Sequence, residues 1–460
     1  MYAPPLPQPA GDQELQPIRS SAELLSPFLI AERPRRLWQV GVEWEKFGVS
    51  VPEMAPVGYW GPRGIEGLFY EFEQRGWQPV REARHLPVIA LQKPGRSITL
   101  EPGAQLELSG APFDDVHGVA RQFEEHHQEL REISEPLGLS WLSVGFHPLF
   151  ERSLLPWVPK RRYAIMRKYL PGQGQGALDM MQRTATIQVN LDFDSETDAM
   201  RKLTALLRMA PIVHAMTAYS PLAEGRLWPT ASLRGEVWLH MDPSRSGLIE
   251  RLWSKRLPAY TDYVDFALKA PMFLFKRGTR SIANTGQPFE DFLANGYRGF
   301  RATLADWKLH LNTLFPEARL KNTIEMRCCD AQSSDLAMAI PALLTGLMYD
   351  QRALEEVHGL LSGLEFSAVQ AARGDLARLG LRANLGSHSV LRLAMELLAI
   401  AEGGLLRRGR LDANLWDERR YLEPLVRLVE HGVTPADRLR QRLSRVGPEP
   451  LGIIEELKVA

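Results

Sequence analysis

Two glutamates stand one residue apart in the stretch GVEWEKFG, residues 41–48. Side chains on a β-strand alternate between its two faces, so Glu43 and Glu45 would project from the same face. Neighbouring carboxylates repel each other unless a cation lies between them or water screens them. The pair therefore indicates either a cation site or a solvated edge strand, and this stretch alone does not separate the two.

A second acidic stretch, LEPGAQLELSGAP at residues 100–112, also has a period of two. Glu101 precedes a Pro-Gly turn signal, after which Gln105 and Glu107 share a face. Alone, the stretch is typical of an amphipathic strand with a turn. Beside the first stretch, it supplies two more carboxylates to a cation site.

A strand over residues 321–327 would carry Lys321, Thr323, Glu325 and Arg327 on one face. An acid between two bases is compatible with a plain salt-bridge ladder. It is also the combination that phosphoryl transfer needs, because a carboxylate can bind a metal ion while cations bind phosphate oxygens.

Further bases come at residues 160–162 and 167–168. The stretch that follows, PGQGQG at residues 171–176, lacks the Lys-Ser/Thr ending of a P-loop and is typical of a flexible loop. Arg234 has the chemistry for a bidentate contact to a carboxylate. Any one of these bases, taken singly, is equally typical of a surface residue.

Residues 184–193 alternate most cleanly between polar and apolar side chains. One face carries hydroxyl, amide and carboxylate groups, from Thr184, Thr186, Gln188, Asn190 and Asp192. A face rich in hydrogen-bonding groups but poor in charge favours substrate recognition over exposure to solvent.

These stretches need a scaffold of strands and helices. The period of two predicts strands over residues 37–47, 97–108, 184–193 and 321–327. Apolar residues at helical spacing predict helices over residues 65–75, 114–135, 196–218, 335–350, 390–402 and 419–431. Without a regular βαβ order, the mixture predicts an α+β fold. We expect a mobile tail at residues 1–18, a catalytic domain at 19–350, and a helical C-terminal region at 351–460 packed on it.

Composition narrows the class of protein. The chain has 55 basic and 55 acidic residues and is 45% hydrophobic, which argues against a nucleic-acid-coating protein and against disorder. Its two cysteines, Cys328 and Cys329, are adjacent, which excludes a disulfide framework and favours free thiols in a reducing compartment. No secretory signal or apolar run of about 18 residues is visible. We therefore predict a cytoplasmic protein with neither nucleic acid nor membrane as a partner.

Taken together, the stretches resemble the plant-type and proteobacterial glutamate–cysteine ligases. The resemblance runs in order over residues 37–350, through GVEWEKFG, LEPGAQLELSGAP, RYAIMRKYLP (162–171), LDMM (178–181), QVNLDF (188–193), residues 220–226, Trp307 with His310, FPEARLK (315–321) and EMR (325–327). It implies the glutamine-synthetase-like fold: a curved, largely antiparallel sheet with a concave active-site face and helices packed outside. It also implies the ATP-dependent joining of the γ-carboxylate of L-glutamate to the amine of L-cysteine through γ-glutamyl phosphate, the first step of glutathione synthesis.

The resemblance implies a role for each matching residue. The ligands of two or three Mg²⁺ ions would be Glu43, Glu45, Glu101, Glu107, Gln188 and Glu325. Catalysis would rest on Lys321 and Arg327, which with Lys168 would also contact ATP. The substrate-binding residues would be Arg162, Arg167, Met181, Thr184, Thr186, Asn190 and Arg234. Tyr260, Tyr263 and Trp307 are further candidates, and aromatic core is the alternative for each.

Some questions stay open at this point. The segment Cys328–Gln332 reads CCDAQ where relatives have Gly-Ala-Asp-Gly/Ala-Gly, so the acceptor amine or the local geometry can differ. The alternatives are a ligase with another acceptor amine, a non-catalytic binding homologue, and a two-metal hydrolase. The complete acid set argues against the second, and the lack of a His-rich motif argues against the third. Both a monomer and a homodimer remain compatible with the sequence.

Overall fold

The computed structural model describes residues 12–255, 257–447 and 449–459. Its centre is a ten-stranded sheet in the order β15-β16-β8-β1-β6-β5-β4-β3, with β2 and β7 also paired to β1. The strands are β1 (Val40–Ser50), β2 (Ala55–Pro56), β3 (Gln78–Arg81), β4 (Val88–Lys93), β5 (Arg96–Leu100), β6 (Leu106–Ser109), β7 (Leu139–Leu142), β8 (Ile187–Leu191), β15 (Ala318–Leu320) and β16 (Ile324–Met326). All its pairings are antiparallel, which confirms the predicted fold class.

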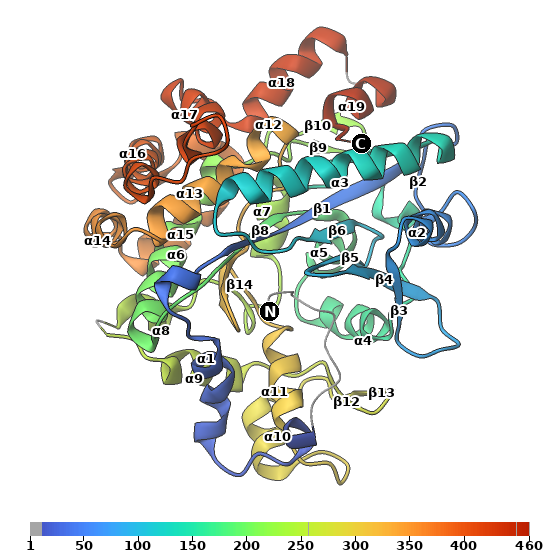
Figure 1. Ribbon diagram of the computed structural model, residues 1–460, viewed down its shortest axis with the longest axis vertical. Coiled ribbons are helices and arrows are strands. Elements are labelled where there is room, and N and C mark those ends of the chain that lie inside the picture. Colours follow the sequence, from blue (N-terminus) through green and yellow to red (C-terminus); the bar gives the residue numbers. More distant parts are fainter. Residues whose placement is uncertain (1–11, 256, 448, 460) are drawn as a thin grey trace.

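Helices surround this sheet (Figure 1). They are α1 (Ser26–Ala31), α2 (Ile65–Gln74), α3 (Val116–Leu137), α4 (Arg161–Tyr169), α5 (Ala177–Arg183), α6 (Glu196–Met216), α7 (Leu233–Leu239), α8 (Glu250–Ser254), α9 (Tyr260–Lys269), α10 (Phe289–Asn295), α11 (Leu304–Leu311), α12 (Ser334–Ala337), α13 (Ala339–Met348), α14 (Gln351–Leu360), α15 (Phe366–Leu379), α16 (Val390–Arg408), α17 (Glu423–Glu430), α18 (Pro435–Val446) and α19 (Pro450–Leu457). The remaining strands form short pairs: β9 (Leu222–Ala223) with β10 (Arg226–Leu227), β11 (Ser246–Gly247) with β14 (Phe315–Pro316), β12 (Leu274–Arg277) with β13 (Arg280–Ala283), and β17 (Asn384–Leu385) with β18 (His388–Ser389).

The predicted helices are present, with boundaries set by local chemistry. The helix predicted at 114–135 begins at Val116, because the Asp115 carboxylate accepts the Gly118 N–H at 2.7 Å and caps it. The prediction at 335–350 divides into α12 and α13 at Met338. Pro341 supplies the reason, since it has no N–H to donate to the carbonyl four residues earlier.

The predicted strands lie in the sheet, but with other bounds. The stretch 97–108 forms two strands, β5 and β6, joined by a turn, and the stretch 321–327 contributes only Ile324–Met326, because residues 321–323 lie in the turn after β15. In the stretch 184–193, regular pairing begins only at Ile187. Thr184 and Thr186 instead form isolated bridges to Phe146 and Asp330. The Thr186 hydroxyl donates to the Cys329 carbonyl at 2.6 Å. Here the chain therefore bonds to the loop that follows β16 instead of to β16 itself.

The two faces of the sheet differ as the alternation predicts. Val42 and Trp44 on β1 lie opposite Val189 and Ile187 on β8, and all four are buried. Helices α3, α6 and α13 pack against these strands and their neighbours, and Trp44 stacks on Phe123 of α3 with ring centroids 3.8 Å apart. The opposite face of β1 therefore carries Glu43 and Glu45.

Residues 12–18, which the sequence assigned to a mobile tail, pack against the region around α11. The backbone N–H of Ile18 bonds the Ala302 carbonyl at 3.0 Å, and Glu14 forms an ion pair with Lys308. Residues 1–11 of that predicted tail lie outside the described residues. In the described part of the chain, no helix is long and apolar enough to cross a membrane.

Helices α14 to α17 stack beside α13 and α6, whereas α18 and α19 pack on each other, with α19 against β7 (Figure 1). The closest approach is between α13 and α16, where two glycines meet. A Cβ on Gly404 would lie 2.0 Å from the Gly346 carbonyl oxygen, so no side chain fits there. At the other end, the Val459 N–H bonds the Trp141 carbonyl at 2.8 Å and adds residues 458–459 to the edge of β7.

This helix contact generates a stability prediction. Gly404→Ala should lower the free energy of unfolding by about 1–3 kcal/mol, because the added methyl group forces α13 and α16 apart. The control is the adjacent Gly403→Ala, whose new Cβ would meet only the flexible end of Arg407. That change should be neutral or stabilising by up to about 1 kcal/mol, since alanine favours a helix. Urea unfolding measures both, and equal effects would contradict the close contact.

Candidate active site

Strand register brings the predicted acids together on the polar face of the sheet. Glu45 pairs directly with Glu107 across β1 and β6, and Glu43 pairs with Gln188 across β1 and β8. On the far side of β8, Asn190 pairs with Glu325. Residues directly opposite on antiparallel strands have Cβ atoms about 5 Å apart. Six residues from four separate stretches of sequence thus form one continuous polar surface.

Neutral donors hold the three acids of β1 and β6. Asn190 Nδ2 donates to Glu43 Oε1 at 3.0 Å, and Gln188 Nε2 donates to Glu45 Oε1 at 3.2 Å. The Thr99 hydroxyl donates to Glu107. The hydrogen-bonding face predicted for substrate therefore positions carboxylates as well.

These carboxylates are poorly stabilised as anions. Burial, followed by repulsion from Glu325 and Glu107, raises the pKa of Glu43 to about 8. Burial and the charges of Glu101 and Glu107 raise the pKa of Glu45 well above its usual value, and that of Glu107 is raised in the same way. A bound cation would reverse this effect, because it stabilises the ionised form.

The opposite end of the surface is basic. Glu325 receives Arg319 Nε at 2.6 Å, Arg327 Nη1 at 3.2 Å and Lys321 Nζ at 3.7 Å. Burial alone would raise the pKa of Glu325, but these three cations outweigh burial and hold it well below its ordinary value. One oxygen, Glu325 Oε1, is buried without a hydrogen-bond partner in the described structure.

Gln188 joins the two ends. Its amide oxygen accepts a hydrogen bond from Arg327, while its amide nitrogen donates to Glu45. Expected as a metal ligand, it serves in this structure as a bridge between an acid and a base. As the side chains stand, no three acidic, histidine or cysteine residues among those described are close enough together to hold a metal ion.

Glu101 lies beyond β5, at the margin of this surface. Tyr163 OH donates to Glu101 Oε1 at 3.3 Å, and Arg162 Nη2 lies 3.7 Å from the same oxygen. Arg162 is thus next to a candidate ligand. By contrast, Arg167 stacks over Trp157, 4.6 Å from the ring centroid, and Lys168 is exposed on α4.

The other predicted substrate residues occupy several environments. Met181 is buried in α5, and the Thr184 hydroxyl donates to the Met180 carbonyl at 2.7 Å. The aromatic candidates are core residues: the Tyr263 hydroxyl accepts the Leu320 N–H at 3.2 Å, Trp307 Nε1 donates to the Leu24 carbonyl at 3.0 Å, and Tyr260 packs on Phe28.

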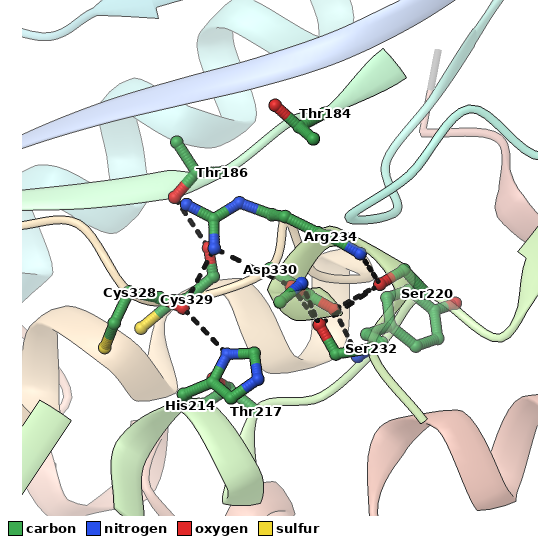
Figure 2. A network of polar contacts seen from close by, with 12 residues as sticks. Thr184, Thr186, His214, Thr217, Ser220, Ser232, Arg234, Cys328, Cys329 and Asp330 are labelled. Atoms are coloured by element: carbon green, nitrogen blue, oxygen red, sulfur yellow. Dashed lines mark hydrogen bonds and ion pairs between the residues drawn. The ribbon is translucent and has the colours of Figure 1, made fainter. Parts of the chain in front are cut away.

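Arg234 is buried in α7, where its guanidinium donates to main-chain carbonyls and lies 3.9 Å from the Asp330 carboxylate (Figure 2). Nη2 donates to the Arg327 carbonyl at 2.7 Å and Nη1 to the Cys328 carbonyl at 3.0 Å. The side chains of Cys328 and Cys329 are buried in the core, so only their carbonyls take part. The segment that departs from its relatives is therefore held through its backbone.

Sequence reasoning missed Arg319 and Thr99. Arg319 lies in a matched motif and faces Glu325 across the β15–β16 hairpin. Treating residues 318–326 as a hairpin would have paired the two, because Thr323 and its neighbours form the turn between them. Thr99 faces Glu107 across the β5–β6 hairpin in the same manner. In both cases the signal is a short chain reversal rather than a motif.

A family model described as glutamate-cysteine ligase family 2 matches residues 39–456. The chloroplastic glutamate–cysteine ligase of Medicago truncatula is 37% identical over 406 residues, which are 87% of this chain and 78% of the relative. Glutamate–cysteine ligase B, chloroplastic, of Oryza sativa subsp. japonica is 36% identical over 421 residues, 91% and 82% of the two chains.

Among solved structures, glutamate–cysteine ligase from Francisella tularensis in complex with AMP superposes with a TM-score of 0.56 at 14% identity. The match covers 91% of this chain and 87% of that one. At this identity the likeness shows the fold alone.

The same relatives correct one prediction. The cytoplasmic location inferred from the sequence is wrong by this comparison, because the relatives from Medicago, Oryza, Brassica and Arabidopsis are all named as chloroplastic. The inference rested on free thiols and on the lack of a secretory signal. Free thiols favour a reducing compartment, but they do not distinguish the cytoplasm from the interior of a reducing organelle.

The unlike surroundings of two glutamates generate a second prediction, to be measured in EDTA. Because the pKa of Glu43 is raised in the folded protein, this carboxyl stabilises the fold below its unfolded pKa, and the stabilisation is lost as the pH rises towards 8. Glu43→Gln should therefore stabilise the metal-free protein by on the order of 2–4 kcal/mol at pH 8 and by less than about 1 kcal/mol at pH 5.

Glu325 is the matched comparison, because its substitution should change the stability of the fold in the opposite direction. Its folded pKa is depressed, so its ionised form stabilises the fold at neutral pH, and the effect is lost only as the pH falls below the unfolded value. Glu325→Gln should destabilise the protein at pH 7. Thermal unfolding of both variants between pH 5 and pH 8 tests this, and shifts of the same sign would contradict the charge arrangement.

Proposed function

Because the chain belongs to the glutamate–cysteine ligase family 2, as its resemblance predicted, we propose that it joins the γ-carboxylate of L-glutamate to the amine of L-cysteine with the cleavage of ATP. The observation that supports this best is the division of one sheet face into two unlike halves. Glu43, Glu45 and Glu107 form an acidic half, and Arg319, Lys321 and Arg327 gather around Glu325 in a basic one. The acidic half suits the metal ion of a metal-bound triphosphate, and the basic half suits its phosphate groups.

The donor set has the chemistry for Mg²⁺, and binding would draw its acids together, because no three of the described ones converge as the side chains stand. The acids supply hard oxygen ligands, their pKa values are raised by burial and mutual repulsion, and Glu325 Oε1 is a buried oxygen without a partner in the described structure. We assign the ion-binding role to Glu43, Glu45, Glu101, Glu107 and Glu325. When bound, Mg²⁺ neutralises phosphate charge. Gln188, whose amide oxygen already accepts from Arg327, is assigned to alignment of the two halves.

The basic half fits the chemistry of activation. A carboxylate is a poor acyl donor because its oxygen is a poor leaving group. Transfer of the γ-phosphoryl group of ATP to the γ-carboxylate gives γ-glutamyl phosphate and ADP, and attack by the amine of cysteine then expels phosphate. Arg327 and Lys321 flank the place where this charge develops, and their cations stabilise the transferring phosphoryl group.

A phosphate-release assay tests the reaction. Purified protein with Mg²⁺ and ATP should release phosphate at its full rate only when L-glutamate and L-cysteine are both present, because the amine completes the turnover. Other amines are screened in place of cysteine. Full release with glutamate and a different amine, and none with cysteine, would overturn the proposed acceptor. Hydrolysis of ATP without dependence on any amino acid would overturn the ligase reaction.

Arg327 supplies the matching residue test. Arg327→Ala should lower kcat by about 10²–10³-fold, the loss typical of removing one group that stabilises charge in the transition state. The control is Arg36→Ala, at an exposed position in the short 3₁₀ helix that precedes β1. Thermal unfolding checks that Arg327→Ala is folded. An activity equal to that of the control would exclude Arg327 from the reaction.

A further inference from the structure

The loop that follows β16 is held by its backbone. In residues 327–329, every carbonyl oxygen accepts a hydrogen bond from a buried side chain. Arg234 binds those of Arg327 and Cys328, and the Thr186 hydroxyl donates to that of Cys329 at 2.6 Å. His214 Nδ1 lies 3.2 Å from the Cys328 oxygen and donates to it as well (Figure 2).

Asp330, the next residue, is fully buried and accepts three hydrogen bonds. Its Oδ2 accepts the Ser220 hydroxyl at 2.7 Å and the Tyr219 N–H at 2.8 Å, and its Oδ1 accepts the Ser232 hydroxyl at 3.0 Å. Arg234 Nη1 lies 3.9 Å from Oδ1 and is its nearest cation. A buried carboxylate with this many donors is held in one position.

These contacts close a ring. Ser232 caps the start of α7, where its hydroxyl oxygen accepts the Gly235 N–H at 2.9 Å. Arg234 comes two residues later, and its guanidinium returns to the carbonyls that precede Asp330. The backbone of Gly145 packs directly against this ring, where a Cβ on Gly145 would lie 2.4 Å from the Asp330 carboxyl carbon. No side chain fits between the two.

Arg327 is fixed from both sides by this ring and by the sheet. Before it, Met326 pairs with Val189 of β8. Its own N–H bonds the Glu317 carbonyl at 3.0 Å, and its carbonyl is bound by Arg234. With the backbone held at each end, its guanidinium is directed at Glu325 and Gln188.

We propose that Asp330 and Arg234 are positioning residues that hold Arg327 in place. This proposal rests on the proposed function. Arg234 acts through the carbonyls of Arg327 and Cys328, to which its Nη2 and Nη1 donate. Asp330 keeps Arg234 in place, because a buried guanidinium needs a nearby anion. Loss of either residue frees the loop and moves the guanidinium of Arg327, and a displacement of about 1 Å can lower a rate by about a hundredfold.

A double-mutant cycle tests the proposal in the full-length protein. Asp330→Asn should lower kcat by about 10–100-fold and change the KM values for ATP and glutamate by less than about threefold. In an Arg327→Ala background, Asp330→Asn should cause no further loss, because the residue acts only through Arg327. Losses that multiply in the double variant would overturn the proposal.

Arg234 gives a second, independent arm. Like Asp330→Asn, Arg234→Ala should lower kcat and leave the KM values for ATP and glutamate nearly unchanged. A large increase in the glutamate KM at unchanged kcat would mean that Arg234 binds the substrate carboxylate, and would overturn its positioning role.

The controls separate positioning from folding and from the reaction itself. Asp335→Asn removes an acid of the next helix that pairs with Arg438 on the surface, and it should leave kcat unchanged. If Asp330→Asn fails to fold, Ser232→Ala and Ser220→Ala each remove one donor and take its place in the cycle. The wild-type assay is run first, so a protein with no amino-acid-dependent turnover contradicts the proposed function, and the cycle is read only on an active enzyme.

Discussion

Crowding of like charge on a buried surface is the constraint around which the site is built. Glu43, Glu45 and Glu107 project from adjacent strands of one antiparallel sheet, where their neighbours and their burial both oppose ionisation. Amide and hydroxyl donors hold them in fixed positions but add no charge. On the same face, positive charge is in excess around Glu325, where three cations surround one carboxylate. Each half carries an excess that only a partner of opposite charge relieves, and a triphosphate with its metal has both signs.

The strand faces could be predicted from sequence because the alternation of side chains is local. The stretch 41–48 placed Glu43 and Glu45 together, and the stretch 184–193 separated its amides from its apolar residues, as the sheet has them. The order of strands could not be predicted, since nothing within β1 indicates that β6 lies on one side and β8 on the other. Pairings that depend on that order, such as that of Gln188 with Arg327, therefore could not be predicted from the sequence.

Arg234 shows a different limit. Its residue type suits a carboxylate, and the family resemblance implied a substrate contact. In the fold, its guanidinium lies against two carbonyls whose position depends on the end of β16 and on the cap of α7. A residue's chemistry restricts its partners to a class, whereas the partner itself is chosen by tertiary packing. The same holds for Asp330, whose three donors come from a segment about a hundred residues earlier.

The pairing of residues 458–459 with β7 has a consequence for biosynthesis. Strand β7, which is bound to β1, is completed only when the Val459 N–H reaches the Trp141 carbonyl. Translation proceeds at about 5–20 residues per second, so the strand emerges from the ribosome roughly 15–60 s before its partner. During that interval it is an open edge able to pair with other chains. This edge of β7 therefore gains its partner from residues 458–459 only after almost all of the sheet has been synthesised.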